Sequence, residues 1–380
     1  MDEDDKLQEQ RVLTLLKALK EASKDLHTNP FTSLCKINTH SNVAIDAFLV
    51  LEAKSVAIFQ THPNLRHLSE SLSTLKAQIE KLEKFKGFGL RSLLRRQITL
   101  HKISHLANSI ESQIQRYLDR VTVRDLVITM EHRDDEEEKV KALVEFQERL
   151  SQGFDLDFQD LILKARVFNI LERTLFELML SKRVQEEAAI AIAGLVKFNK
   201  NVFVGLVLMG PTIKALIAMA SSVSIRVLCE LVSFIRSPLV DEILCNGEIP
   251  RIVGFLCCQD FCVKVAAFAC VLELGYIGRK EVIEAMLEEG LIKILMDLQR
   301  REGLLSEILE GDDLDLDLDS DSPFVSCVSR FAIQVEVGEG LSPEEKREFK
   351  LEILKMVMEA SQSDAEAAEV SAEILWGSSP

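Results

Sequence analysis

Three stretches of this sequence align without gaps and decide its fold. They read Val184-Gln-Glu-Glu-Ala-Ala-Ile-Ala-Ile-Ala-Gly-Leu195, Val223-Ser-Ile-Arg-Val-Leu-Cys-Glu-Leu-Val-Ser-Phe234 and Val263-Lys-Val-Ala-Ala-Phe-Ala-Cys-Val-Leu-Glu-Leu274. Their first valines lie 39 and 40 residues apart. A second landmark has nearly the same period, because Gly210, Gly247 and Gly290 lie 37 and 43 residues apart, each between two apolar runs of helical character. Two landmarks with one period of about 40 residues predict a helical solenoid.

The three glycines also predict the turns of this solenoid. The runs that follow them share one register: Gly210-Pro-Thr-Ile-Lys-Ala-Leu216, Gly247-Glu-Ile-Pro-Arg-Ile-Val253 and Gly290-Leu-Ile-Lys-Ile-Leu-Met296. Glycine adopts the left-handed backbone conformation without steric cost, and this conformation reverses the chain tightly after a helix. We therefore expect a left-handed turn at each glycine, between the first and second helices of a repeat.

These features resemble the armadillo-repeat family. In that family a short first helix and a glycine turn precede a second helix that begins with Ile-Pro, and a long third helix completes the repeat. Residues 246–256 are similar to that second helix, and residues 184–195 to the core of the third. The resemblance implies an all-α solenoid of five to six repeats over residues 122–376. It is most specific in the three central repeats, because terminal repeats act as caps.

Long amphipathic helices are expected before the repeats. Apolar residues recur with the helical period in residues 7–26, 42–60, 65–85 and 90–118. Asn29-Pro30 ends the first helix, because a residue before proline is pushed out of the α region. Gly87-Phe88-Gly89 separates the last two helices. We expect residues 1–121 to form a four-helix bundle.

Composition and charge exclude several classes of protein. Aromatic residues make up 6% of 380 residues, with only 16 Gly and 8 Pro, which excludes a collagen, a disulfide knot and a disordered chain. Residues 1–121 hold 18 Lys and Arg against 14 Asp and Glu, whereas residues 122–380 hold 27 against 47. So acidic a region repels phosphate backbones, and we expect no nucleic-acid partner.

More narrowly, the whole chain resembles plant armadillo-repeat proteins. A helical N-terminal domain commonly precedes the repeats in that group, as it also does in plant U-box ubiquitin ligases. The U-box itself is absent here, because residues 117–123 run directly from the predicted bundle into the repeats. The resemblance implies an adaptor or substrate-binding component of a ubiquitin ligase pathway as one alternative, without ligase activity of its own.

No catalytic motif accompanies the repeats. The sequence holds no phosphate-binding G-x-x-x-x-G-K, no G-x-S-x-G and no H-E-x-x-H. His101 and His105 share a helix face at a spacing that can hold a metal, but no third ligand is near in sequence, so a polar bundle face is expected. We therefore predict a noncatalytic protein-protein interaction scaffold that needs no metal or cofactor.

The cysteines and one apolar segment bear on localisation. The eight cysteines lie mostly in apolar stretches and form no C-x-x-C pair. They predict reduced, buried thiols, which are typical of a protein that resides in the cytoplasm or also in the nucleus. An acidic start, with Asp2 and Glu3 after Met1, does not predict a signal peptide. Residues 202–225 are mostly apolar, but Gly210-Pro211 interrupts the segment and Lys214 places a charge within it. We therefore expect two short helices and no membrane span.

The resemblance also indicates where a partner would bind. Third helices line the concave surface of an armadillo solenoid, and karyopherin-type members carry a ladder of Asn there with Trp nearby. The matching positions here are Gly194, Ser233 and Glu273, and the only Trp is Trp376, so capture of a nuclear localisation signal is not expected. Glu230 and Glu273 favour a basic or amide-rich ligand, unless they are acids that merely face solvent.

Two charged segments carry alternative hypotheses. A basic stretch could dock on anionic lipid or an acidic partner, or could be a solvated helix face; it comprises Lys81, Lys84, Lys86, Arg91, Arg95, Arg96 and Lys102. Residues 303–322 are too charged to pack and predict an exposed loop between the second and third helices of one repeat. Their L-x-L-x-L string resembles the plant EAR-type repression motif, which suggests a co-repressor bridge or else a soluble spacer; the segment includes Asp312, Asp313, Leu314, Asp315, Leu316, Asp317, Leu318 and Asp319.

Overall fold

A computed structural model describes residues 3–28, 65–84, 90–132, 134–177, 179–309 and 323–376. Every regular element in these ranges is a helix, which confirms the predicted all-α class. The chain divides into two compact units, one of residues 1–125 and 155–161 and the other of residues 126–154 and 162–380. The division falls inside one helix, and the predicted boundary after residue 121 lies in that same helix.

The described residues of the first unit form α1 (Glu3–Thr28), α4 (Arg66–Lys84), most of α5 (Leu90–His132) and the first part of α7 (Leu156–Lys164). Helices α1, α4 and α5 share one apolar core, to which Leu16 and Leu19 of α1, Leu72 and Leu75 of α4, and Ile110 of α5 contribute fully buried side chains. Three of the four predicted helices are thus present, while the one expected at residues 42–60 lies outside the described residues.

Helix α5 corrects one predicted end. It was expected to stop at residue 118 but continues to His132. The cause is that apolar residues persist at helical spacing beyond residue 118, without glycine or proline, and Val121, Leu126 and Met130 are buried. The next helix, α6 (Glu136–Ser151), begins where the Asp135 side chain accepts hydrogen bonds from the backbone N–H groups of Glu137 and Glu138.

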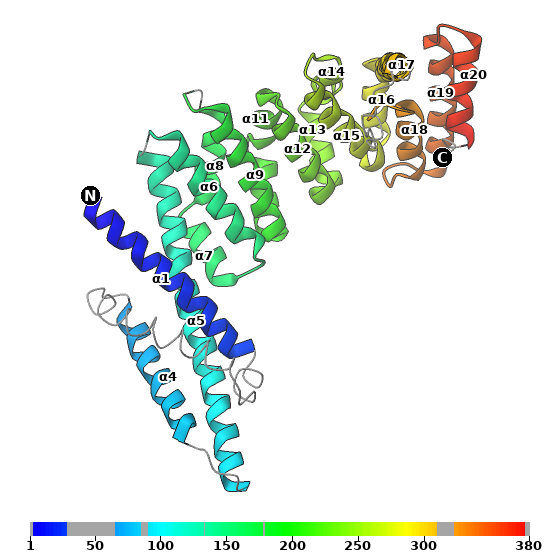
Figure 1. Ribbon diagram of the computed structural model, residues 1–380. Coiled ribbons are helices and arrows are strands. Elements are labelled where there is room, and N and C mark those ends of the chain that lie inside the picture. Colours follow the sequence, from blue (N-terminus) through cyan, green and yellow to red (C-terminus); the bar gives the residue numbers. More distant parts are fainter. Residues whose placement is uncertain are drawn as a thin grey trace. The chain divides into compact units, whose positions relative to one another are not determined.

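In the second unit the helices recur in sets of three (Figure 1). The helices that follow α6 are α7 (Leu156–Lys164), α8 (Val167–Phe176), α9 (Lys182–Phe198), α10 (Lys200–Met209), α11 (Thr212–Met219), α12 (Ser222–Ile235), α13 (Ser237–Cys245), α14 (Ile249–Gly254), η2 (Phe255–Cys257), α15 (Phe261–Ile277), α16 (Lys280–Glu288), α17 (Leu291–Leu309), α18 (Cys327–Val337), α19 (Pro343–Ala360) and α20 (Asp364–Trp376). The third helices pack on one another in the order α6, α9, α12, α15, α18. This arrangement is an α-solenoid, as the period of about 40 residues predicted, and its sets of three helices agree with the armadillo type that the resemblance implied.

The three aligned stretches lie on α9, α12 and α15, and each of these helices begins at a side-chain cap. Ser181 accepts a hydrogen bond from the Val184 N–H, Ser221 from the Ser224 N–H, and Asp260 from the Val263 N–H. Such caps satisfy backbone donors that have no partner within the helix. The cap therefore recurs with the same period as the apolar pattern and helps to set the start of each third helix.

Two of the three glycine turns are as predicted. Gly247 and Gly290 have φ of 67° and 74°, in the left-handed region. The prediction for Gly210 is wrong, because its φ is −95°. Gly210 is instead closely packed: a Cβ there would lie 2.9 Å from the carbonyl oxygen of Leu206 and 2.2 Å from Oε1 of Glu172, which accepts a 2.6 Å hydrogen bond from the Thr212 hydroxyl.

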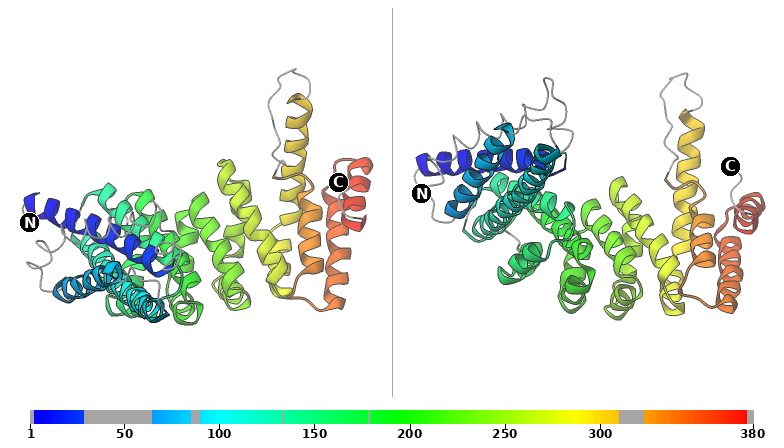
Figure 2. Two further views of the ribbon diagram at one scale, coloured as in Figure 1. Left: turned by 60° about the horizontal axis from the view of Figure 1, so that its bottom comes forward. Right: turned by 90° about the horizontal axis from the view of Figure 1, so that it is seen from below.

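Helix α17 corrects the start of the predicted acidic loop. The loop was expected from residue 303, but α17 is helical to Leu309 and extends past its neighbours (Figure 2). Gly303 is the only helix breaker in residues 300–309, and a single glycine is tolerated inside a helix. Residues 310–322, which include Asp312 and the whole L-x-L-x-L string, lie outside the described residues, between α17 and α18.

The apolar segment around Gly210 forms two short helices, as predicted. Within the described part of the chain, no single helix is long and apolar enough to cross a membrane. Helices α10 and α11 reach the length and apolar composition of a membrane span only when taken together, and they are bent by 71° at the break between them.

The cysteines depart from the prediction of buried thiols. All seven described cysteines are free, but only Cys270 and Cys327 are buried. Cys245, Cys257 and Cys262 are exposed, because each lies on the solvent side of an otherwise apolar helix or turn. An apolar neighbourhood in sequence therefore did not determine the burial of these side chains.

Candidate partner-binding site

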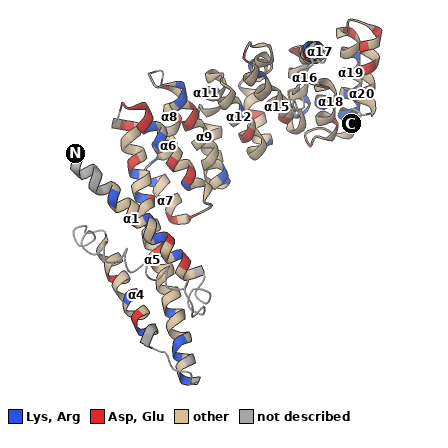
Figure 3. Cartoon of the chain, viewed as in Figure 1, with Lys and Arg blue, Asp and Glu red and all other residues tan. Residues whose placement is uncertain are grey.

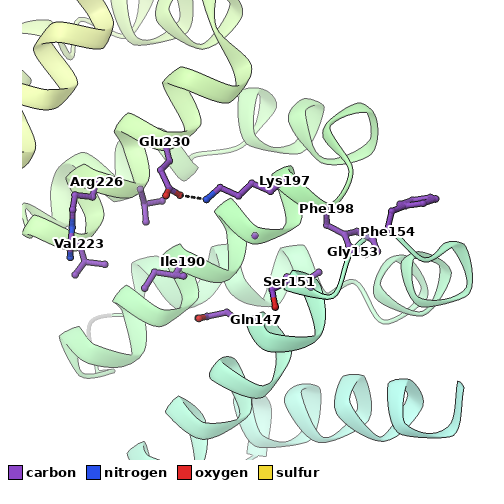
Figure 4. A pocket seen from close by; sticks show the side chains of 13 residues that line it. Gln147, Ser151, Gly153, Phe154, Ile190, Lys197, Phe198, Val223, Arg226 and Glu230 are labelled. Atoms are coloured by element: carbon purple, nitrogen blue, oxygen red, sulfur yellow. Dashed lines mark ion pairs between the residues drawn. The ribbon is translucent and has the colours of Figure 1, made fainter. Parts of the chain in front are cut away.

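The stacked third helices carry a hollow on the face formed by α6, α9 and α12, shown in Figure 4. Its volume is about 690 Å³, and we call it the α9 hollow. Its walls come from α6 and the residues just after it, from α9 and from α12. The lining residues are Gln147, Leu150, Ser151, Gly153, Phe154, Ile190, Gly194, Lys197, Phe198, Val223, Arg226, Val227 and Glu230.

Gly194 opens this hollow. It lies in the second half of α9, where most residues would place a side chain against α6. A Cβ at this position would lie 3.1 Å from Cδ1 of Leu150, so that even alanine would press on its neighbour. The absent side chain leaves Leu150, Ile190 and Val227 as apolar walls.

Aromatic rings form one end of the hollow. Phe154, in the turn after α6, is 60% exposed, and its ring lies 5.6 Å from that of Phe198 at the end of α9. A phenylalanine that is mostly exposed beside a recess can cover an apolar group placed there.

The charged lining residues differ in their partners. Lys197 on α9 forms an ion pair with Glu230 on α12, with 2.9 Å between Nζ and Oε2 (Figure 4). The same ammonium group lies 5.4 Å from the centre of the Phe234 ring. Arg226, one turn before Glu230 on α12, is exposed and has no ion pair among the described residues. The uncompensated charge of the hollow is therefore positive.

The structure brings together only some of the residues predicted for the groove. Gly194 and Glu230 both line the α9 hollow. Ser233 is exposed on the next turn of α12, and Glu273 is half-buried on α15, so neither contributes to the hollow. Glu230 is paired, whereas Glu273 forms no ion pair with any described residue.

The thiol of Cys229 lies on α12 next to Glu230. Burial raises its pKa to about 12, and the negative charges of Glu273 and Glu230 add to this effect. The group is therefore protonated at neutral pH and is not an activated nucleophile.

Sequence reasoning missed Ile190, Arg226 and Phe154. The first two lie inside the aligned stretches, where their exposure could have been read from the helical register: Arg226 falls one turn before Glu230 on the same face. Phe154 lies in a turn between repeats, and no periodic signal marks it.

The predicted basic residues lie on the first unit (Figure 3). Lys81 and Lys84 are at the end of α4, and Lys86 lies outside the described residues. Arg91, Arg95 and Lys102 are exposed along α5, and Arg96 is half-buried there. On the same helix Leu94 and Ile98 are 65% and 56% exposed, while His101 and His105 are exposed and belong to no cluster of metal-ligating side chains within the described ranges.

Several solved structures are similar to this chain. A designed armadillo repeat protein is 17% identical, with 67% of this chain and 98% of that chain covered and a TM-score of 0.44. A second designed armadillo repeat protein, in complex with the peptide (KR)4, is 18% identical over 68% of this chain and 98% of its own, with a TM-score of 0.45. An engineered protein is 15% identical over 96% of this chain and 88% of its own, with a TM-score of 0.46.

No family model matches the chain, and no curated protein matches it. The description of the second unit as a solenoid therefore rests on its own helices, which recur in sets of three and stack through their third helices.

Proposed function

We propose that this protein is a noncatalytic scaffold that binds a segment of another protein on the face of its third helices. The observation that carries the proposal is the α9 hollow, where three successive third helices leave about 690 Å³ open to a partner side chain. The hollow combines apolar walls with a few charged groups at its margin, as sites that bind part of a protein surface do.

The solenoid suits this role for a physical reason. Each repeat packs mainly on its neighbours, so the third helices present one face along several repeats. Side chains on this face are free of core packing and can differ from repeat to repeat without loss of the fold. Gly194, Ser233 and Glu273 occupy equivalent positions on α9, α12 and α15 and are chemically unlike one another. A face of this kind has the variety that specific recognition requires.

Affinity capture with the full-length chain, followed by mass spectrometry, tests the proposal. The decisive variant is Gly194→Arg, because its side chain fills the α9 hollow. The matched control is Gly205→Arg, since Gly205 is exposed in the middle of α10 and a Cβ there meets nothing within 4 Å. Both variants must retain the helical circular dichroism of the wild type.

A partner retained by wild type and Gly205→Arg but lost from Gly194→Arg is the expected result. Partners that bind all three proteins equally would contradict the proposal and direct attention to Arg91 and Arg95 of the first unit. Recovery of a ubiquitin-conjugating enzyme or a cullin among the lost partners would favour the alternative in which the chain is an adaptor or substrate-binding component of a ubiquitin ligase pathway. Ubiquitin transfer by the purified chain alone would contradict a noncatalytic function.

A further inference from the structure

We propose that the partner segment is apolar and acidic: a large apolar side chain enters the α9 hollow, and a carboxylate of the same segment pairs with Arg226. This inference rests on the proposed function and specifies its ligand. It reverses the preference for a basic ligand that Glu230 and Glu273 suggested from the sequence.

The first step is the shape and chemistry of the hollow. Gly194 lines it without a side chain, and a Cβ at this position would lie 3.1 Å from Cδ1 of Leu150. Ile190, Val223 and Val227 extend the apolar wall across to α12, and Ile190 is 36% exposed. Filling such a recess with a leucine or aromatic side chain removes apolar surface on both partners from water, which favours binding by about 25 cal/mol per Å².

The second step is the balance of charge around the recess. Three charged side chains line it, and two of them, Lys197 and Glu230, neutralise each other. Arg226 is the third, and its guanidinium group makes no hydrogen bond or ion pair with any residue that the structure describes. A ligand carboxylate can accept two parallel hydrogen bonds from such a group.

The neighbouring polar groups are already engaged. The Gln147 amide donates to the backbone carbonyl and to the carboxylate of Glu187, each at 2.9 Å. The Ser151 hydroxyl donates to the carbonyl of Glu148 at 2.7 Å. Arg226 is consequently the polar group at the hollow that has most to gain from a ligand.

The third step fixes where the acidic residue lies. Glu273 lies on α15, which packs next to α12, and its carboxylate forms no ion pair with any described residue. It repels a ligand carboxylate over α15, whereas Arg226 attracts one over α12. The apolar residue and the acid must therefore be close in the partner sequence, because both contacts fall on α9 and α12.

A displayed library of random 16-residue peptides, selected on the immobilised full-length chain, tests the inference. Parallel selections use Arg226→Glu, Gly194→Arg and the control Gly205→Arg. Arg226 is exposed, so its replacement is expected to leave the fold intact, which thermal unfolding followed by circular dichroism checks. We expect wild type and control to enrich peptides with a large apolar residue and an Asp or Glu within a few positions.

Charge reversal is the decisive readout. A fluorescent peptide of the enriched sequence should bind Arg226→Glu about tenfold or more weakly, which is at least the loss expected for one lost charge pair. The same peptide with its acid replaced by Lys should regain affinity for Arg226→Glu. A merely structural effect of the substitution would not be rescued in this way.

Two failures are distinguishable. Peptides that bind wild type and are lost from Gly194→Arg, but carry no acid or bind Arg226→Glu equally, would overturn this inference and leave the proposed function intact. Peptides that bind Gly194→Arg as well as wild type, or no enrichment on wild type, would count against both.

Discussion

Two regions of the solenoid use glycine in opposite ways. On α9, Gly194 borders a recess, and the atom nearest to an added Cβ is the end of the flexible Leu150 side chain. In the turn after α18, a Cβ at Gly340 would lie 2.0 Å from the carbonyl oxygen of Gly278. One glycine thus borders open space, and the other lets two backbone segments touch. The residue type alone does not tell these roles apart; the neighbouring atom does.

Side chains also tie the carboxyl-terminal part of the face across repeats. Glu339, between α18 and α19, pairs with Arg236 at the end of α12 and accepts a 3.2 Å hydrogen bond from the Tyr276 hydroxyl of α15. Its own N–H donates to the Tyr276 carbonyl at 2.7 Å. Arg236 has a φ of 69°, which is unfavourable for a residue with a side chain. The helix ends and turns in this region are thus joined by their own residues, whereas the α9 hollow is open.

The largest effect is expected from Gly340→Ala. The added Cβ meets backbone that cannot rotate away, so the turn after α18 must shift. We expect the free energy of unfolding to fall by about 3 kcal/mol, at the upper end for overpacked sites. Urea unfolding followed by circular dichroism measures it.

Gly205→Ala is the matched control for this change, because a Cβ in the middle of α10 has nothing within 4 Å. Alanine there should raise stability by about 0.5–1 kcal/mol through helix propensity. Equal effects at residues 205 and 340 would show that the close approach at Gly340 is not tight in solution.

The next largest effect is expected at Arg300, which holds the last two helices to α17. Its guanidinium group bonds the Glu366 carboxylate of α20 at 2.5 Å and the Ala360 carbonyl of α19 at 2.8 Å. Both ionic side chains are about one-fifth exposed. Arg300→Ala should therefore lower the free energy of unfolding by about 2 kcal/mol, which is the typical contribution of hydrogen bonds to charged groups. Urea unfolding measures the change, with Arg347→Ala, exposed on α19, as the control.

The same pair predicts the direction of a pH effect. Burial tends to raise the pKa of Glu366, but hydrogen bonds from the Gln362 N–H and from Arg300 outweigh it, and the pKa is lowered overall. A lowered pKa in the folded state contributes stability above the pKa of the unfolded chain, and this is lost as the pH falls through the folded value. The stability gap between wild type and Arg300→Ala should therefore narrow in acid; a constant gap would contradict the ionic contribution.

The periodic features of the fold could be predicted from the sequence. The third helices were placed correctly because their apolar spacing and their repeat period agree. The errors arose where the pattern is not periodic. Helices α5 and α17 continue beyond their predicted ends, where no glycine or proline pattern marks a stop, and Gly210 packs against Glu172, a residue 38 positions earlier.

The site was predictable only in part, for a related reason. The register placed Gly194 and Glu230 on the third-helix face, and both line the hollow. That Lys197 neutralises Glu230 while Arg226 stays unpaired depends on how side chains reach between helices. The region as a whole is acidic, but the charged side chains that line the hollow carry a net positive charge, so the net charge of the region does not predict the charge of the hollow.

Gly194→Ala sharpens the contrast with Gly340→Ala, because it is the same substitution at the open end of the face. The alanine gains helix propensity of about 1 kcal/mol, and a contact of 3.1 Å with a flexible leucine offsets part of this gain. Stability should change by less than about 1 kcal/mol, while affinity for the selected apolar peptide falls. Unfolding and fluorescence anisotropy on the same preparations measure both. A loss of stability as large as that of Gly340→Ala would mean that the hollow is a packing defect rather than a site.

The smallest effect on stability is expected from Glu230→Gln, and its effect on binding separates the two interpretations of the face. Lys197 and Glu230 are 42% and 49% exposed, and ion pairs so exposed contribute roughly 0.5 kcal/mol. The substitution leaves Lys197 without its ion-pair partner, so the hollow carries two unpaired positive groups instead of one. If the ligand is acidic, its affinity should rise a few-fold at low salt, and added salt should remove the gain. If the ligand is basic, the same substitution deletes an attractive carboxylate and affinity must fall. The sign of the change in peptide affinity, measured by fluorescence anisotropy at two salt concentrations, therefore decides between them.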